Sequence, residues 1–380
     1  MTCHVDDGAA AEYVAVTDFH NGLRTERAGI IWDGVDTSVV EGAKFDWQIT
    51  DVIDDGTDLA ISWVATYDPD GADGPAAPIG LDPCNATAGE NAPVFDGDDA
   101  GNLSMLYTYM QGGDPIRGTA SGAGQASSVN LDTGNTTCAA GVATTTITPD
   151  RVAGATVGRI ALQGKPRVIS VADPTALMQV RAKTPVYDFV VGSGDPAQAR
   201  RTITDTAKCL QCHVGSLYQH GGNRVDNVEM CILCHNSASN EQYVREGVYN
   251  IDASVAYDGK AGQTFEMKSM LHAVHSAGEE GNAPIVIYRP VARGIYAWAY
   301  DESYLMNWPG EGPNEVFGSD SGLTPNHIFH TPTYPKALYD CGACHDDTFA
   351  NLLPGQTVAM ATTLAASEDP DEADWADQLD

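Results

Sequence analysis

Basic residues are scarce in this sequence, which sets 20 lysines and arginines against 52 aspartates and glutamates for a formal net charge of −32. Such a chain repels polyanions, so nucleic-acid binding is excluded. Long apolar runs are also missing: no stretch reaches about 18 residues, so no helix is expected to cross a bilayer. Nor does an apolar signal-peptide core follow Met1. The chain still has 43% hydrophobic residues, enough for a folded core.

Nine cysteines are present, and six of them form three identically spaced pairs, each followed by a histidine. The C-x-x-C-H pattern attaches haem c, because two thiols bond to the haem vinyl groups and the adjacent imidazole becomes the proximal iron ligand. The three copies are Cys209-Leu210-Gln211-Cys212-His213, Cys231-Ile232-Leu233-Cys234-His235 and Cys341-Gly342-Ala343-Cys344-His345.

Zinc ribbons and thioredoxin-like motifs also contain C-x-x-C pairs. A ribbon has no use for a histidine after every second cysteine, and no βαβ pattern surrounds these motifs, so haem is favoured. Because c-type haem is attached outside the cytoplasm, we expect an exported protein at the outer cell surface or beyond it. The printed sequence is then expected to be a mature form or a fragment.

Three cysteines remain outside the motifs. Cys84 and Cys138 lie in one strand-rich region and are expected to form a disulfide, worth about 4 kcal/mol in the chain-entropy model. A disulfide fits an oxidising compartment.

Residues 25–194 have the composition of a β domain, with short strand-like runs between turns rich in Gly, Asp, Thr and Pro. Apolar residues alternate along 59–67, and the runs 45–49, 103–110, 159–172 and 186–191 are expected to behave in the same way. An antiparallel sandwich or barrel is predicted, serving as a spacer or docking module. Its Asp-rich turns at 68–71 and 96–99 leave calcium as an alternative, but ordinary turn chemistry is favoured.

Residues 195–355 are predicted to form a loop-rich multihaem domain with a few short helices and the haems as its core. Its clearest helix is predicted over 264–277, with Thr264 as N-cap and Gly278 as the stop. His272 and His275 lie three residues apart on one face of this helix, where neighbouring irons can each take one as a distal ligand. Its apolar side is expected to contain Met267, Met270, Leu271 and Val274. Residues 1–24 are expected to be an arm or the remnant of a haem segment, and 356–380 an acidic tail.

Residues 212–231, followed by Met270-Leu271-His272-Ala273-Val274-His275, resemble the cell-surface multihaem cytochromes of metal-reducing bacteria, the OmcA/MtrC type. The segment 158–167 also resembles the β-domain exit of that family. The resemblance implies alternating β and haem domains, closely packed haems with two histidine ligands each, and electron delivery to extracellular acceptors. By position it implies His220, His272 and His275 as distal ligands. This chain has three complete motifs where a full member has ten, so it resembles a shortened module of one β domain and one haem domain.

Several histidines stay unassigned. Met1-Thr2-Cys3-His4 would end a fourth motif if a cysteine preceded Met1, which would give four haems, with His20 as the distal partner. Alternatively, His4 or His20 ligates a haem of the next subunit, or both are surface residues. His327 and His330 are also open, and either is an alternative distal ligand for the haem at His345.

Irons held by two histidines leave no position open to a substrate, so electron transfer rather than catalysis is the favoured function. Its partners would be other multihaem cytochromes or extracellular acceptors. The alternative is a reductase of a small oxyanion or metal, which needs one open haem lined by basic groups. A third possibility is a homo-oligomeric filament in which stacked subunits form a continuous haem wire.

Overall fold

The computed structural model describes residues 31–32, 35–68, 77–81, 83–84, 103–110, 116–117, 126–169, 173, 175, 177–198, 202–213, 216–219, 223–236, 239–254, 256, 258–288, 295–300, 328–330, 332–338 and 340–346. The chain divides into two units. The β unit comprises residues 1–119, 126–199 and 213–233, and the haem-motif unit comprises 120–125, 200–212 and 234–380. The predicted domain limits, 25–194 and 195–355, stay predictions.

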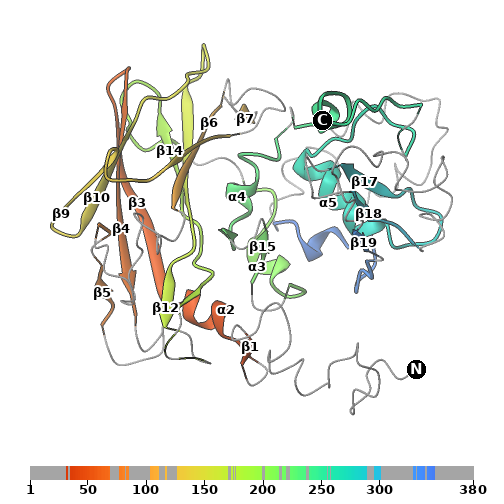
Figure 1. Ribbon diagram of the computed structural model, residues 1–380, viewed down its shortest axis with the longest axis horizontal. Helices are drawn as coiled ribbons and strands as arrows, with labels where there is room; N and C mark the ends of the chain where they lie inside the picture. The colour runs from red at the N-terminus through yellow and green to blue at the C-terminus, as the bar shows by residue number, and fades with distance from the viewer. Residues whose placement is uncertain are drawn as a thin grey trace. The chain divides into compact units, whose positions relative to one another are not determined.

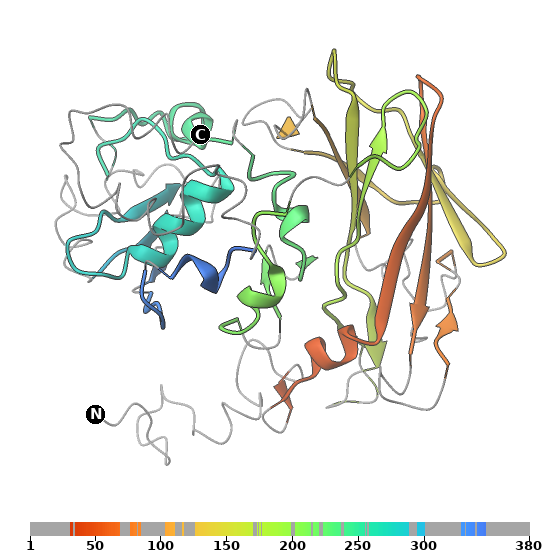
Figure 2. The same cartoon turned by 180° about the vertical axis from the view of Figure 1, so that it is seen from behind.

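Two five-stranded antiparallel sheets form the β unit, as Figures 1 and 2 show. The first has the order β3-β4-β10-β9, with β5 beside β4, and the second has the order β14-β11-β6-β7, with β8 beside β6. The predicted antiparallel sandwich is thereby confirmed. The strands are β3 (Phe45–Asp54), β4 (Leu59–Tyr67), β5 (Ile79–Gly80), β6 (Ser104–Met110), β7 (Ile116–Arg117), β8 (Ser127–Asn130), β9 (Thr136–Ala139), β10 (Val142–Ile147), β11 (Val157–Gln163) and β14 (Val186–Val190).

Smaller elements complete this unit. The short pairs are β1 (Ile31–Trp32) with β2 (Val35–Asp36), β12 (Arg167–Ile169) with β13 (Leu177–Gln179), and β15 (Tyr218–Gln219) with β16 (Arg224–Val225). The two short helices are α2 (Thr37–Gly42) and α4 (Val228–Cys231).

The core lies between the two sheets. In β4, buried residues alternate with partly exposed ones, and Leu59, Ile61 and Trp63 have no exposed surface. The alternation expected for 103–110 and 159–172 is wrong: all seven residues of β6 are buried, and so are six of the seven in β11. The reason is that the second sheet is covered on its other face too, by the segment that contains β16 and α4.

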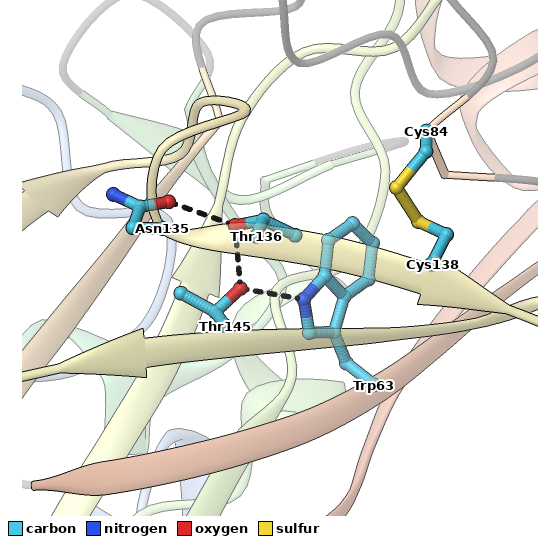
Figure 3. The surroundings of a disulfide bond; sticks show 6 residues. All are labelled: Trp63, Cys84, Asn135, Thr136, Cys138 and Thr145. Atoms are coloured by element: carbon cyan, nitrogen blue, oxygen red, sulfur yellow. Dashed lines mark hydrogen bonds between the residues drawn. A yellow bond between two sulfur atoms is a disulfide. The ribbon is translucent and has the colours of Figure 1, made fainter.

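The predicted disulfide is present. Cys84 and Cys138 are joined with their Cα atoms 5.8 Å apart, an ordinary separation for such a bond. Figure 3 shows it beside Trp63, whose indole N–H donates to Thr145 Oγ1 at 3.1 Å. Thr145 in turn shares a 3.0 Å hydrogen bond with Thr136, so the buried indole nitrogen is linked to a hydroxyl pair rather than left without an acceptor.

The haem-motif unit contains a small sheet that the sequence analysis did not predict. It has the order β17-β18-β19, in which β17 and β18 are antiparallel and β18 and β19 are parallel. The helix α5 lies over it, because Met270, Val274 and Ala277 pack with Ile285 and Ile287. The described part of this unit therefore has an apolar core of its own. Its elements are α3 (Thr206–Cys209), the π-helix Val244–Val248, α5 (Met267–Ser276), β17 (Ile285–Tyr288), β18 (Ile295–Trp298), β19 (Ile328–His330) and the 3₁₀ turn Cys341–Ala343.

The ends of α5 differ from the prediction. Its N-cap is Glu266, whose carboxylate accepts hydrogen bonds from the backbone N–H groups of Lys268 and Ser269, whereas Thr264 instead donates to Ser239 O. A glutamate reaches the first-turn N–H groups here because Thr264 is occupied with a neighbouring loop. Gly278 follows the C-cap as predicted, but for a different reason: a side chain at this position would collide with the carbonyl of Pro332. No helix in the described part of the chain is long and apolar enough to span a membrane.

Candidate haem-attachment site

Each haem-attachment motif lies on a short helical turn. Asp205 caps α3 by accepting a hydrogen bond from Ala207 N at 2.8 Å, and α3 ends at Cys209. Cys212 N then donates to Cys209 O at 3.1 Å, which closes the turn. A turn of this kind places residues i and i+3 on one side, as the attachment of both thiols to one porphyrin edge requires. None of the six motif cysteines forms a disulfide.

Two motif histidines have their ring orientation fixed by the main chain. His235 Nδ1 lies 2.9 Å from Phe265 O, and His345 Nδ1 lies 3.1 Å from Ile203 O. A ring nitrogen beside a carbonyl is the protonated one, which places the lone pair on Nε2. An imidazole held by a carbonyl through Nδ1 is the usual support for a metal ligand. The residues therefore fit a bound iron.

The third motif pairs with the segment that leads into the first. Thr204 and His345 form an antiparallel bridge, and Asp205 N donates to Cys344 O at 2.9 Å. The Lys208 ammonium also donates to His345 O, at 2.8 Å. Motifs that are more than 100 residues apart in sequence are consequently neighbours within the haem-motif unit.

The thiols of these two motifs meet. Cys209 and Cys344 share a side-chain hydrogen bond, which raises the pKa of Cys209 and lowers that of Cys344. The Tyr334 hydroxyl also donates to Cys344. Burial, followed by the charge and hydrogen bond of Cys344, raises the pKa of Tyr334 to about 12. Thiols from two motifs therefore lie within one polar cluster.

His272 on α5 lies against His345. Their ring centroids are 6.1 Å apart and the planes are inclined by 53°. Metal–imidazole bonds of about 2 Å place the centroids of two rings that ligate one ion from opposite sides about 6 Å apart. His272 keeps an exposed edge, yet desolvation, followed by repulsion from the imidazoles of His345 and His275, lowers its pKa. A lowered pKa favours the neutral ring that binds metal.

One turn further along α5, His275 contacts the same cluster. Its ring meets Tyr334 edge to face with centroids 5.7 Å apart, and its Nδ1 lies 2.8 Å from Leu271 O. The structure therefore brings both α5 histidines to the third motif. That neighbouring irons each take one of them stays a prediction.

Other predicted ligands are not tested. His213 follows the first motif in an exposed bend, and His330 ends β19, where its side chain is not described. Cys3, His4, His20, His220 and His327 lie outside the described residues. The two calcium candidates also lie outside them, except for Asp68. Among the described residues no three His, Cys, Asp or Glu side chains converge as a metal site.

Several residues of the site were missed by the sequence analysis. Phe265 contacts the His235 ring edge to face with centroids 6.3 Å apart and also supplies its carbonyl acceptor. Tyr334, Lys208 and Ile203 were likewise not named. Main-chain acceptors leave no trace in a sequence, so only the two aromatic residues near histidines carried any signal.

The comparisons with known proteins agree with the geometry. Residues 201–374 match the family model described as outer membrane cytochrome MtrC/MtrF-like, domains II/IV. No curated protein and no solved structure gives a significant match. The matched residues include all three motifs and α5. Residues 201–374 are therefore similar to domains II/IV of the MtrC/MtrF-like outer membrane cytochromes, as the resemblance of the motifs indicated.

Proposed function

We propose that this protein carries electrons at the cell surface through three c-type haems. The thioether bonds would come from the motif cysteines, and His213, His235 and His345 would be the proximal ligands. The observation that carries the proposal is the pair His272 and His345, whose 6.1 Å spacing suits two imidazoles on one iron. When bound, each haem supplies an iron that cycles between ferric and ferrous forms without breaking bonds.

We assign His272 to the third motif and His275 to the first. His272 lies beside the proximal histidine of the third motif. His275 contacts Tyr334, which donates to Cys344, and Cys344 shares a hydrogen bond with Cys209 of the first motif. His220 is left as the proposed distal ligand of the second motif. The haems of the first and third motifs would then be direct neighbours, so electrons need not follow the order of the motifs along the chain.

Irons closed by two histidines transfer electrons without binding substrate. The carbonyls of Phe265 and Ile203 orient the imidazoles of His235 and His345, which would keep the ligand set the same in both oxidation states. Little reorganisation then accompanies each transfer. A reductase of a small oxyanion or metal would instead need one open iron.

Haem counting and ligand exchange test this function. Mass spectrometry of the intact protein is expected to find a haem on each motif peptide, and EPR is expected to find every iron low-spin. His272→Met is expected to give one iron a methionine ligand, with its characteristic absorption and a higher potential. Lys268→Met, one turn earlier on α5, is the control and should leave the spectrum unchanged. A high-spin fraction in the unaltered protein would favour the reductase, and a colourless preparation would end the proposal.

Partners and assembly follow from the same proposal. Electron exchange with other multihaem cytochromes or extracellular acceptors suits a family of the outer membrane. A filament of stacked subunits stays a prediction, as does a fourth haem at Cys3 and His4. Electron microscopy tests the filament directly, and particles that stay monomeric at high concentration would count against it.

A further inference from the structure

The second haem-attachment motif begins on α4, a helix that a buried arginine holds against two strands of the second sheet. Arg159 lies in β11 and is 2% exposed. Its Nε and Nη2 donate to the two carboxylate oxygens of Asp188 on β14, at 2.6 and 2.8 Å. Its Nη1 donates to the carboxylate of Glu229 in α4 at 2.6 Å and to the carbonyl of the same residue at 3.1 Å. One side chain thus connects two strands to the helix that ends at Cys231.

Other contacts fix the start of the same helix. Asn227 caps α4 by accepting a hydrogen bond from Glu229 N at 3.1 Å, and its amide donates to Thr184 O at 2.8 Å. Thr184 also exchanges main-chain and side-chain hydrogen bonds with Val225. The segment is therefore registered on the β unit before the first cysteine of the motif is reached. In Figures 1 and 2, α4 lies on the side of the second sheet that faces away from β3 and β4.

A buried guanidinium destabilises the folded state unless its N–H groups donate hydrogen bonds. An unpaired buried charge costs several kcal/mol, so breaking such a pair from one side is strongly destabilising. A charged, bidentate pair also holds a more exact geometry than apolar packing does. The carbonyl bond matters most here, because it ties Arg159 to the backbone of α4 two residues before Cys231.

We propose that Arg159 is a positioning residue for the second haem, holding α4 so that Cys231 is presented for thioether formation, and that its ion pair with Glu229 sets the potential of that haem. This rests on the proposed function. It also changes the interpretation of the β unit, which would act as a part of one haem site rather than as a spacer. A carboxylate near an iron favours the ferric form, and a cation favours the ferrous form.

The chain offers a matched control. Arg151 makes a similar bidentate pair with Asp54 in the same unit, at 2.7 and 2.9 Å, and this pair does not involve α4. Arg159→Gln and Arg151→Gln would be compared in the exported, haem-loaded protein. Both are expected to lower the melting temperature. Only Arg159→Gln is expected to reduce haem occupancy of the peptide containing Cys231, at least twofold by mass spectrometry, while the other two motif peptides stay fully loaded.

The reduction potential of the second haem distinguishes a positioning role of Arg159 from a general effect on stability. The signal of the second haem is identified by its loss from a Cys231→Ala, Cys234→Ala variant. Glu229→Gln keeps the pair of Arg159 with Asp188, and it is expected to raise the potential of this haem alone. Arg159→Lys keeps the charge and is expected to restore the potential more fully than Arg159→Gln does. Arg151→Gln is expected to leave it unchanged.

The outcomes are decisive. If Arg159→Gln and Arg151→Gln lower the melting temperature alike while occupancy and potential stay at the original values, Arg159 is a structural residue and the inference is wrong. If Arg159→Gln does not fold, Glu229→Gln decides, and an unchanged potential overturns the inference. An unaltered protein without haem would instead refute the proposed function, so the two failures are distinguishable.

Discussion

The two units reach stability in different ways. The β unit has an extended apolar core between its sheets, with Leu59, Ile61 and Trp63 fully buried, and a disulfide beside it. The described part of the haem-motif unit has fewer buried apolar residues, with Ala277, Ile285 and Ile287 in one cluster beside α5 and Val244, Ile251 and Tyr288 also buried. Small cores often depend on metals, disulfides or cofactors for stability. On the proposed function, we therefore expect bound haem to add more to the stability of the haem-motif unit than to that of the β unit.

A buried network of ion pairs lies beside the apolar residues of the haem-motif unit. Arg245 is completely buried and donates to Glu241 at 2.8 Å and to Asp258 at 2.9 Å. Its guanidinium also lies 4.3 Å from the centre of the Tyr288 ring. Such a network fixes geometry but contributes little net stability, because desolvation offsets the attraction. The network therefore fixes the geometry of this unit more than it raises its stability.

Loss of haem is expected to have the largest effect on amide protection, and to affect the haem-motif unit far more than the β unit. In a variant with alanine at all six motif cysteines, amide protection across β17 and α5 is expected to fall at least about 100-fold, because sub-global opening becomes easy without the cofactors. Protection in β4 and β6 is expected to persist. Hydrogen exchange with mass spectrometry measures both. Equal loss in the two units would break the comparison.

Removal of the disulfide is expected to destabilise the β unit and to leave the haem-motif unit unchanged. Replacing Cys84 and Cys138 by alanine is expected to lower the free energy of unfolding of the β unit by about 4 kcal/mol, because the unfolded chain gains freedom. Denaturation followed by tryptophan fluorescence measures this loss. The haem absorption spectrum is expected to stay unchanged, and a spectral change would mean that the units are coupled.

The pH dependence of the haem-motif unit is expected to come from Glu241. Burial raises its pKa from 4.5 to about 7, against the opposing effect of Arg245. Between these values the folded state binds more protons than the unfolded state, so stability falls as pH rises, by up to about 3 kcal/mol. Denaturation curves at several pH values test this. In Glu241→Gln the slope across the window should vanish, whatever its overall stability.

Asp54 gives the β unit the opposite dependence and the smallest effect. Burial alone would raise its pKa, but hydrogen bonds from Arg151 and from the backbone of Gly192 and Gly56 outweigh this and lower it from 3.8 to about 2. The lowered pKa stabilises the folded state by about 2 kcal/mol at pH values above 3.8, the pKa in the unfolded chain. This stabilisation is lost as the pH falls through the pKa of the folded state. Acid titration of Asp54→Asn is expected to lack this loss. Loss of equal size in the variant would assign the acid sensitivity elsewhere.

Much of this fold could be predicted from the sequence where a pattern is local. The alternation in β4 and the disulfide follow from residue order alone. The full burial of β6 and β11 could not be predicted, because it results from a segment more than 60 residues further along that packs on their outer face. The run 285–288 is apolar and fully buried, so its strand signal is local and could be predicted from the sequence.

The candidate site also combines features that a local pattern predicts with features that depend on distant segments. The motif spacing predicts the attachment cysteines and the proximal histidines, and the spacing of His272 and His275 predicts that both lie on one face of α5. The proposed pairing of these histidines with the motifs depends on the contact of 204–205 with 344–345, which joins distant segments and is encoded by no local pattern.

That contact has a consequence for biogenesis. The residues that lead into the first motif are completed by the strand-like pairing of Thr204 with His345. On the proposed function, the surroundings of the first haem are complete only after the segment of the third motif has been made. We therefore expect a truncation before residue 341 to damage both proposed haem sites rather than one.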